Sequence, residues 1–177
     1  MDMSAPNLGF KHITSENWQK PDMPRYFPQM TKEIWIQDHL RPHLHASVPR
    51  EVQGLFEAAR GIMIYGWFFY PMVTLGFEQC FRALEAAAHH CCKKHGIPIE
   101  TTDDKGKKRP VKYADQIKRL VEKNIISVDE ESRWKGARLL RNHVAHPKAQ
   151  MILSPGMTVS SLTQVAEDIN RLFKSEV

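Results

Sequence analysis

The chain has 177 residues, of which 42% are hydrophobic, and a formal net charge of +5. This length allows one domain with an extension, and a core that does not depend on disulfides. Only three cysteines, no export-type leader and no uninterrupted apolar stretch of roughly 20 residues argue against a disulfide framework, secretion and a membrane span. We therefore expect a soluble, cytoplasmic protein.

Residues 1–48 are expected to form an irregular N-terminal arm. They hold five of the eleven prolines and scattered aromatic residues, without a sustained period. They also contain five Lys and Arg residues and five Asp and Glu residues, so the surplus positive charge belongs to the rest of the chain. The arm is too aromatic for a free linker. We expect it to pack on the bundle or on a partner subunit, with a short helix over 32–40.

Two helices are predicted between residues 49 and 95. The first has Pro49 in its first turn and runs to about residue 69, before Pro71. The second spans 72–95, because its apolar positions alternate steps of four and three residues. Its opposite side carries a polar stripe, which either meets water or lines a cleft. The stripe consists of Glu78, Arg82, Glu85, His89 and Cys92.

A long connection is predicted over 97–112, followed by a short helix over 113–124. The connection contains the densest group of positive charges in the chain. Such a group can attract a polyanion such as RNA, but we favour the interpretation as a solvated loop between helices. The charged residues are Lys105, Lys107, Lys108, Arg109 and Lys112.

Two further helices complete the predicted bundle. The segment 127–130 has the pattern of a capping box, which starts a helix that Pro147 closes. After a turn over 151–157, a last helix runs through 162–173. No window alternates apolar and polar residues over strand length. We therefore expect an all-α fold, an antiparallel four- to five-helix bundle over 49–177.

The stretch 141–147, with the sequence RNHVAHP, lies where the fourth of these helices is expected to end. It places a guanidinium, an amide and two imidazoles within about two helical turns. Metal-free cleavage of RNA needs a group that moves protons and a cation that stabilises the phosphorane, and imidazole and guanidinium supply these. Asn142 and His146 share a helix face, and Arg138 lies one turn earlier on it. His143 points roughly away from His146.

An Arg followed by a polar residue, with a His five positions after the Arg near a helix end, resembles the signature of the HEPN family of helical-bundle proteins. The order of elements over residues 50–175 is similar to that family as well. The resemblance implies a metal-independent endoribonuclease, often a toxin of toxin–antitoxin or phage-defence systems. It implies no cofactor, and paired Arg and His residues that face each other across a homodimer cleft.

Carried over by position, the resemblance makes Arg141 the phosphate-binding and transition-state-stabilising residue. His146 becomes the general acid and base, and Asn142 the residue that orients the substrate. The other residues implied at the substrate site are Arg138 and His143, with Glu78 and Arg82 on the polar stripe. The implied partners are RNA or a nucleotide, a second subunit and an antitoxin protein.

Other interpretations stay open. The site formed by the motif residues could bind a nucleotide or a partner protein without cleaving RNA. Arg141 could instead brace the bundle by a salt bridge to an acidic residue of the long helix, with His146 capping a helix end.

The His and Cys residues at 89–95 include two pairs with metal-compatible spacing, but the pairs face different directions. We expect no metal there, and a buried Cys91 with surface histidines.

Overall fold

A computed structural model of the protein describes residues 10–22, 26, 28–144 and 153–174, with the backbone alone for 137–144. Within these residues it contains six α-helices and one two-stranded sheet, which confirms a mainly helical fold. None of the described helices is both long and apolar enough to span a membrane. The elements in chain order are α1 (Lys32–Leu40), α2 (Arg50–Tyr65), α3 (Met72–Lys94), β1 (Glu100–Thr102), β2 (Lys108–Pro110), α4 (Tyr113–Glu122), α5 (Val128–Val144) and α6 (Pro155–Leu172).

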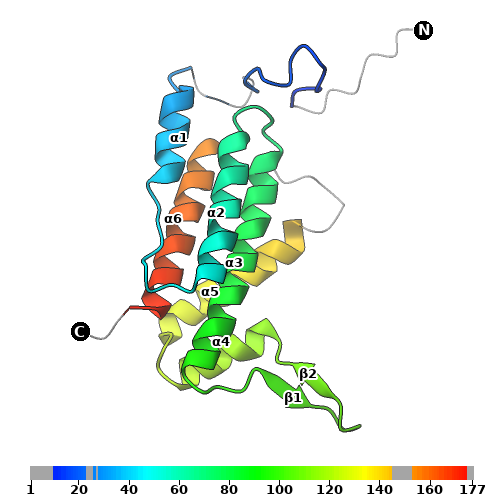
Figure 1. Ribbon diagram of the computed structural model, residues 1–177, viewed down its shortest axis with the longest axis vertical. Helices are drawn as coiled ribbons and strands as arrows, with labels where there is room; N and C mark the ends of the chain where they lie inside the picture. Colours follow the sequence, from blue (N-terminus) through cyan, green and yellow to red (C-terminus); the bar gives the residue numbers. More distant parts are fainter. Residues whose placement is uncertain (1–9, 23–25, 27, 145–152, 175–177) are drawn as a thin grey trace.

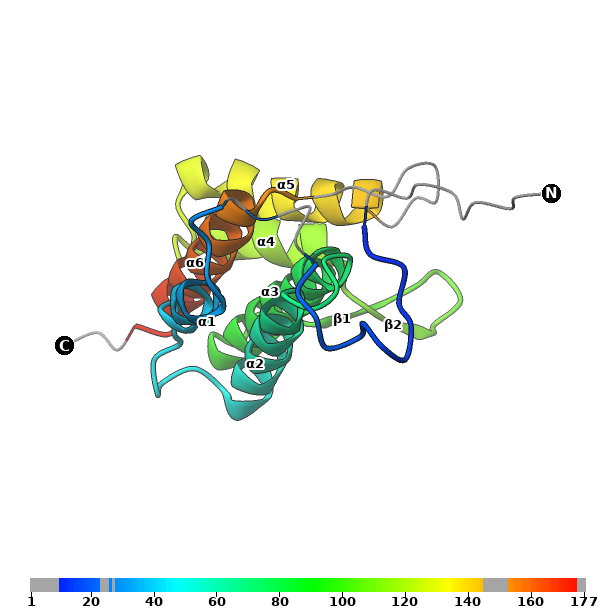
Figure 2. The same cartoon turned by 90° about the horizontal axis from the view of Figure 1, so that it is seen from above.

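Helices α2, α3 and α6 run side by side and form the body of the molecule (Figure 1). The short α1 lies against α2 and α6 in the upper half, whereas α4 and the β-hairpin extend from the lower end. Seen from above, α5 crosses the bundle on the side of α3 that faces away from α2 (Figure 2). α3 is therefore the central helix, in contact with α2, α4, α5 and α6.

The interface between α2 and α3 depends on a glycine at position 76. A Cβ atom there would lie 2.6 Å from the Met63 Cγ atom and 2.9 Å from the Ala59 carbonyl oxygen. Both Ala59 and Met63 are fully buried. The missing side chain at Gly76 thus lets the two helices approach closely enough to exclude water between them.

The helix predicted to run to about residue 69 ends earlier, at Tyr65. Gly66 follows as the C-cap, and its carbonyl oxygen accepts a hydrogen bond of 2.7 Å from the Tyr26 hydroxyl. The turn after it places Trp67 in the core, where its ring centroid lies 4.5 Å from that of Tyr26. The N-terminal arm therefore takes part in ending α2, which the local pattern of α2 does not reveal.

The part of the N-terminal arm that the structure describes packs on its own chain. The short helix predicted over 32–40 is present as α1. Trp35 on this helix is 1% exposed, and its indole nitrogen donates to the Ile64 carbonyl oxygen at 3.0 Å. The buried His39 ring lies 3.2 Å from the Thr158 hydroxyl of α6. These contacts tie α1 to both α2 and α6.

The connection predicted as a loop over 97–112 contains a β-hairpin, so the expectation of no strands is wrong here. Strands β1 and β2 pair antiparallel. The Asp103 carboxylate accepts hydrogen bonds from the backbone amides of Lys105 and Lys107, at 3.1 and 2.9 Å, and orders the turn. Each strand has three residues, all exposed. Because neither strand has a buried face, neither carries the alternating pattern that would predict it.

The turn predicted over 151–157 is, in its described part, the start of α6. The Ser154 side chain accepts a hydrogen bond from the Met157 amide, and Pro155 is the first residue of the helix. Ser, Pro and Gly in succession are common in turns, but Ser as N-cap followed by Pro is also a helix start. The prediction of a turn at residues 154–157 is therefore wrong.

Replacing Gly76 by alanine is expected to lower the free energy of unfolding by about 1–3 kcal/mol, although alanine is the better helix former. The new Cβ atom would meet the backbone of Ala59, which cannot move without separating α2 from α3. The matched control is Gly54→Ala in α2, where a Cβ atom meets no neighbouring atom within 4 Å. This control should gain about 0.5–1 kcal/mol. Urea unfolding followed by circular dichroism measures both, and equal stability of the two variants would contradict the close packing.

Candidate functional site

Four of the predicted site residues lie on α5, and the structure describes them by their backbone alone. They are Arg138, Arg141, Asn142 and His143. His146 lies outside the described residues. The helix is continuous from Val128 to Val144, so positions 134, 138 and 141, which follow one another by four and three residues, share one face of it.

This face of α5 is buried at Trp134. The Trp134 side chain is 3% exposed and lies near Phe81 and Leu84 of α3 around a common cavity. Its carbonyl oxygen accepts a hydrogen bond of 3.2 Å from the Tyr113 hydroxyl of α4. Burial raises the pKa of Tyr113, and the nearby carboxylate of Glu85 adds to this effect. Helix α5 is thus anchored on both α3 and α4 two turns before position 141.

The start of α5 is the capping box that the sequence predicts. The Glu130 amide donates to the Ser127 hydroxyl oxygen at 3.3 Å, and the Ser127 amide donates back to the Glu130 carboxylate at 3.1 Å. The Ser127 hydroxyl also donates to this carboxylate, at 2.8 Å. Two backbone amides that would have no partner at a helix start are thereby satisfied.

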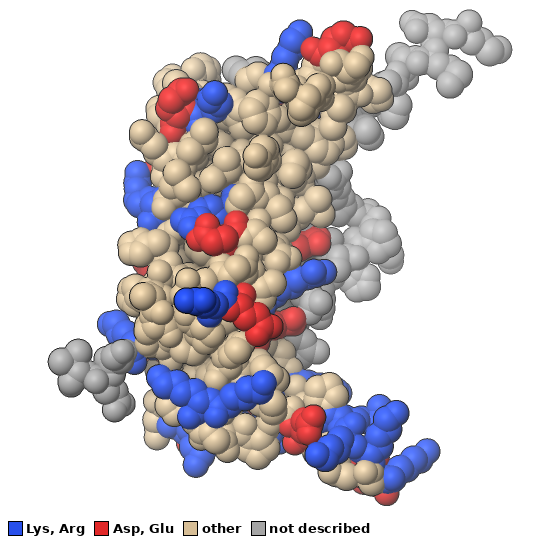
Figure 3. Space-filling view, in the orientation of Figure 1, with Lys and Arg blue, Asp and Glu red and all other residues tan. Residues whose placement is uncertain are grey.

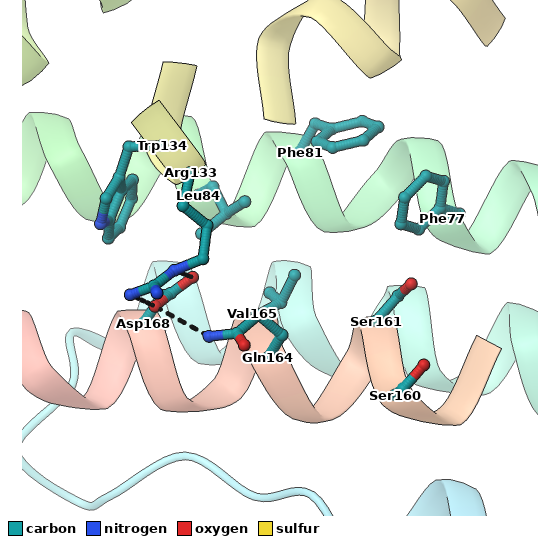
Figure 4. Close-up of a pocket in the computed structure, with 10 residues that line it drawn as sticks. All are labelled: Phe77, Phe81, Leu84, Arg133, Trp134, Ser160, Ser161, Gln164, Val165 and Asp168. Carbon is teal, nitrogen blue, oxygen red and sulfur yellow. Dashed lines mark hydrogen bonds and ion pairs between the residues drawn. The ribbon is translucent and has the colours of Figure 1, made fainter. Parts of the chain in front are cut away.

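A network of two acidic and two basic side chains joins this start of α5 to α6. The Arg133 guanidinium lies 2.9 Å from the Asp168 carboxylate and 3.1 Å from that of Glu130. Arg171 contacts Glu130 as well. The Gln164 amide nitrogen donates to Asp168 at 3.1 Å, and Figure 4 shows this amide and Arg133 converging on the carboxylate. We call the four charged residues the α5–α6 clamp.

The clamp shifts the pKa values of its two acids in opposite directions. Burial raises the pKa of Asp168, against the opposing effect of the Arg133 guanidinium. Partial burial also opposes ionisation of Glu130, but hydrogen bonds from Ser127 and the Arg171 guanidinium lower its pKa to about 2. Since these carboxylates engage both arginines, the clamp holds helices together and is not an open site for anions.

A cavity of about 380 Å³ lies between α3, α5 and α6, beside the clamp. Residues of α3 line one side of it and residues of α6 the other (Figure 4). A concave, largely apolar site with a few polar groups is the usual form of a small-molecule site. Its described apolar residues are Phe77, Phe81, Leu84, Trp134 and Val165, and its described polar residues are Arg133, Ser160, Ser161, Gln164 and Asp168.

The predicted polar stripe of α3 is present only in part. Glu78 is half-buried and Arg82 is exposed, so both reach solvent. Cys92, the last member of the stripe, is fully buried, and its inclusion in a polar face is wrong. Burial raises the pKa of the Cys92 thiol, with an opposing effect of Arg119 on α4. Helix α4 thus covers the end of α3 that the sequence pattern left open.

The described residues hold no group of three His, Cys, Asp or Glu side chains arranged for a metal ion, including those at 89–95. Burial raises the pKa of the Cys91 thiol to about 11, as is usual for a cysteine in a core. His95 is exposed, and the His90 ring reaches Glu51 of α2 at 2.9 Å. Cys91 is buried and His95 is exposed, as predicted, whereas His89 and His90 are half-buried.

No protein-family model matches the chain, and no curated protein or solved structure matches it significantly. The family of the chain is therefore a proposal, supported by the motif on α5 and by the order of the helices.

The sequence pattern did not reveal the α5–α6 clamp. In the sequence, Arg133 falls at helical spacing with the apolar residues Ala137, Leu140 and Val144. Asp168 falls between the buried residues Val165 and Ile169 of α6. A charged residue at an otherwise apolar position of a helix needs a partner when it is buried, so these two positions indicated an ion pair. Which residue is the partner depends on how α5 crosses α6, which the sequence does not state.

Replacing Glu130 by glutamine is expected to lower the free energy of unfolding by about 1–3 kcal/mol at neutral pH. The pKa of Glu130 is lowered from 4.5 to about 2, so its contribution is complete above pH 4.5 and is lost as the pH falls through about 2. Chemical unfolding at a series of pH values should therefore give a flatter profile for Glu130→Gln between these limits.

The matched control for this prediction is Glu122→Gln, which removes an exposed carboxylate 3.8 Å from Lys118. Its effect should stay within about 0.5 kcal/mol, because exposed ion pairs contribute little. If the two variants lose equal stability and keep equal pH profiles, the clamp does not stabilise the start of α5.

Proposed function

We propose that the protein is a HEPN-type, metal-independent endoribonuclease that acts in the cytoplasm through Arg141 and His146. The observation that carries the proposal is that α5 contains Arg141 and Asn142 in its last turn, while its described end, Val144, lies two residues before His146 in the sequence. Arg141 and Asn142 therefore lie near the described end of a helix that the bundle holds in place.

The proposed reaction is attack of the ribose 2′-hydroxyl on the adjacent phosphorus, with loss of the 5′-oxygen. His146 takes the proton of the attacking hydroxyl and returns a proton to the leaving oxygen. Arg141 binds two phosphate oxygens through its planar guanidinium and stabilises the charge that develops on them. Asn142 orients the substrate beside Arg141. The products are a 2′,3′-cyclic phosphate and a free 5′-hydroxyl.

The surroundings of α5 support this proposal. The α5–α6 clamp and Trp134 fix the first half of the helix, so its last turn is presented by a rigid element. Glu78 and Arg82 of α3 reach solvent and are available as substrate contacts. Arg138 and His143 lie on α5 within one turn of Arg141 and complete the proposed set.

We further propose that the protein works as a homodimer, with the Arg141 and His146 of both subunits at one cleft. Two large apolar side chains near the turn between α2 and α3 support an interface, since Tyr65 is 61% and Leu75 is 55% exposed. A monomeric mass in light scattering would contradict the shared cleft. An antitoxin protein is the further partner that this function implies.

A non-catalytic binding module is the second candidate function. The cavity between α3, α5 and α6 favours it, because aromatic walls and polar groups at its side suit a nucleobase. Calorimetric titration with nucleoside monophosphates distinguishes the two functions. Binding that disappears in Trp134→Ala, together with RNA that stays intact, would favour the module.

Cleavage of single-stranded and structured RNA is expected to proceed in the presence of EDTA. Arg141→Ala and His146→Ala should each reduce the rate at least about 100-fold, because one removes the charge stabilisation and the other the proton transfer. His45→Gln, which alters an exposed histidine that is not part of α5 or of the motif, is the control and should leave the rate unchanged.

Three outcomes of this assay would reject the ribonuclease proposal. They are RNA that stays intact with the wild-type chain, cleavage that survives His146→Ala, and cleavage that EDTA abolishes. If Arg141→Ala lowers the melting temperature while the wild-type chain cleaves nothing, the residue braces the bundle instead.

A further inference from the structure

The net charge of the chain is concentrated at one end of the molecule. Residues 93–123, all of which the structure describes, contain ten Lys and Arg residues and five Asp and Glu residues. This excess of five equals the formal net charge of the whole chain. The segment comprises the end of α3, the β-hairpin and α4, and Figure 3 shows Lys and Arg side chains gathered over the lower end and over the hairpin.

Most of these cations are not neutralised by an acidic neighbour. Lys108 and Arg109 pair with Glu100 and Asp103 on the hairpin, and Lys118 pairs with Glu122. Six further lysines are exposed, and no described carboxylate lies within 4.0 Å of any of them. We call these six residues the basic end, and they are Lys93, Lys94, Lys105, Lys107, Lys112 and Lys123.

Helix dipoles explain only half of the basic end. Lys93 and Lys94 lie in the last turn of α3, and Lys123 is the C-cap of α4, where a cation stabilises the unpaired carbonyl groups. Lys105 and Lys107 lie in the exposed turn of the hairpin, where no helix ends. The hairpin lysines therefore have no stabilising role that the fold accounts for.

The basic end is also hollowed. A cavity of about 620 Å³ lies between the ends of α3 and α6 and the turn after α4. Its described lining contains Lys94, Lys123 and Lys174 and no acidic side chain. Lysines that surround a concave surface raise the local concentration of a polyanion more than lysines on a flat one.

The chemistry of this surface favours a phosphate backbone over a membrane. None of the large exposed apolar side chains in the described residues falls between 93 and 123. Insertion into a lipid surface would need such side chains, and base stacking would need exposed aromatic rings. What remains is a set of flexible point charges, which suits phosphates without regard to base sequence.

We propose that the basic end binds the phosphate backbone of single-stranded RNA without sequence preference. This binding surface is separate from the motif on α5. The hairpin lysines Lys105 and Lys107 hold the strand, and the cavity beside Lys94 and Lys123 supplies further cations at the same end of the molecule. The choice of RNA over other polyanions rests on the proposed function. The binding surface itself rests on the charges and on the cavity.

The test compares two double variants in a chain that also carries Arg141→Ala and His146→Ala, so that RNA is not consumed. Lys105→Gln with Lys107→Gln removes two charges of the basic end. Lys20→Gln with Lys32→Gln removes two exposed lysines, of which Lys32 is the first residue of α1, a helix that lies in the half of the molecule opposite the hairpin (Figure 1). Fluorescence anisotropy of a labelled single-stranded RNA of mixed sequence gives Kd over a range of KCl concentrations.

The hairpin variant is expected to bind RNA about tenfold more weakly at moderate salt, because two phosphate contacts are lost. The slope of log affinity against log salt should fall in magnitude by about 1.4. The control variant should match the parent chain in both quantities. Equal affinities and slopes for the two variants would overturn the proposal, as would binding to vesicles of phosphatidylcholine and phosphatidylserine without binding to RNA.

The same two double variants, made in the otherwise native chain, distinguish this proposal from the proposed ribonuclease activity. RNA that is bound through Lys105 and Lys107 but never cleaved supports the binding surface and rejects the nuclease. RNA that is cleaved equally well, and bound equally well, by both variants supports the nuclease and rejects the binding surface.

Discussion

The ion pair between Arg133 and Asp168 is the contact on which the proposed site depends. It joins α5 to α6 at a distance of 2.9 Å, and the Asp168 side chain is only 7% exposed. The Asp168 carboxylate also has Arg171 and Gln164 as partners, and the Arg133 side chain is 38% exposed, so the pair stabilises the contact as part of the whole clamp. Because α5 carries the motif, the path of the helix past α3 and α6 decides where Arg141 is presented.

The proposed chemistry and the proposed electrostatic capture use different parts of the molecule. Phosphoryl chemistry depends on short distances and on a rigid element, which the anchored α5 provides. Capture of a polyanion depends on charge that acts over about 8–10 Å, and mobile lysines on an exposed hairpin are sufficient for it. The central helix α3 connects the two, because α5 packs against it while its last residues belong to the basic end.

Local patterns predicted the elements that local interactions stabilise. The helix predicted over 72–95 is α3, and the capping box predicted at 127–130 has its hydrogen bonds in place. Arg141 and Asn142 were singled out by their resemblance to a family signature, and their backbone lies on a helix, while their roles stay a prediction. The hairpin was missed because its pairing depends on the Asp103 turn and not on a buried face. The position of His146 lies outside the described residues.

The sequence by itself determined a mainly helical chain, the approximate bounds of its long helices and the excess of positive charge after residue 92. Only the tertiary structure decided that Tyr26 helps to end α2, that Cys92 is covered by α4, and that Arg133 meets Asp168. The physical reason is the distance along the chain over which each interaction acts. Periodicity and capping act between residues within one helical turn, whereas burial and buried ion pairs depend on which helices meet in space.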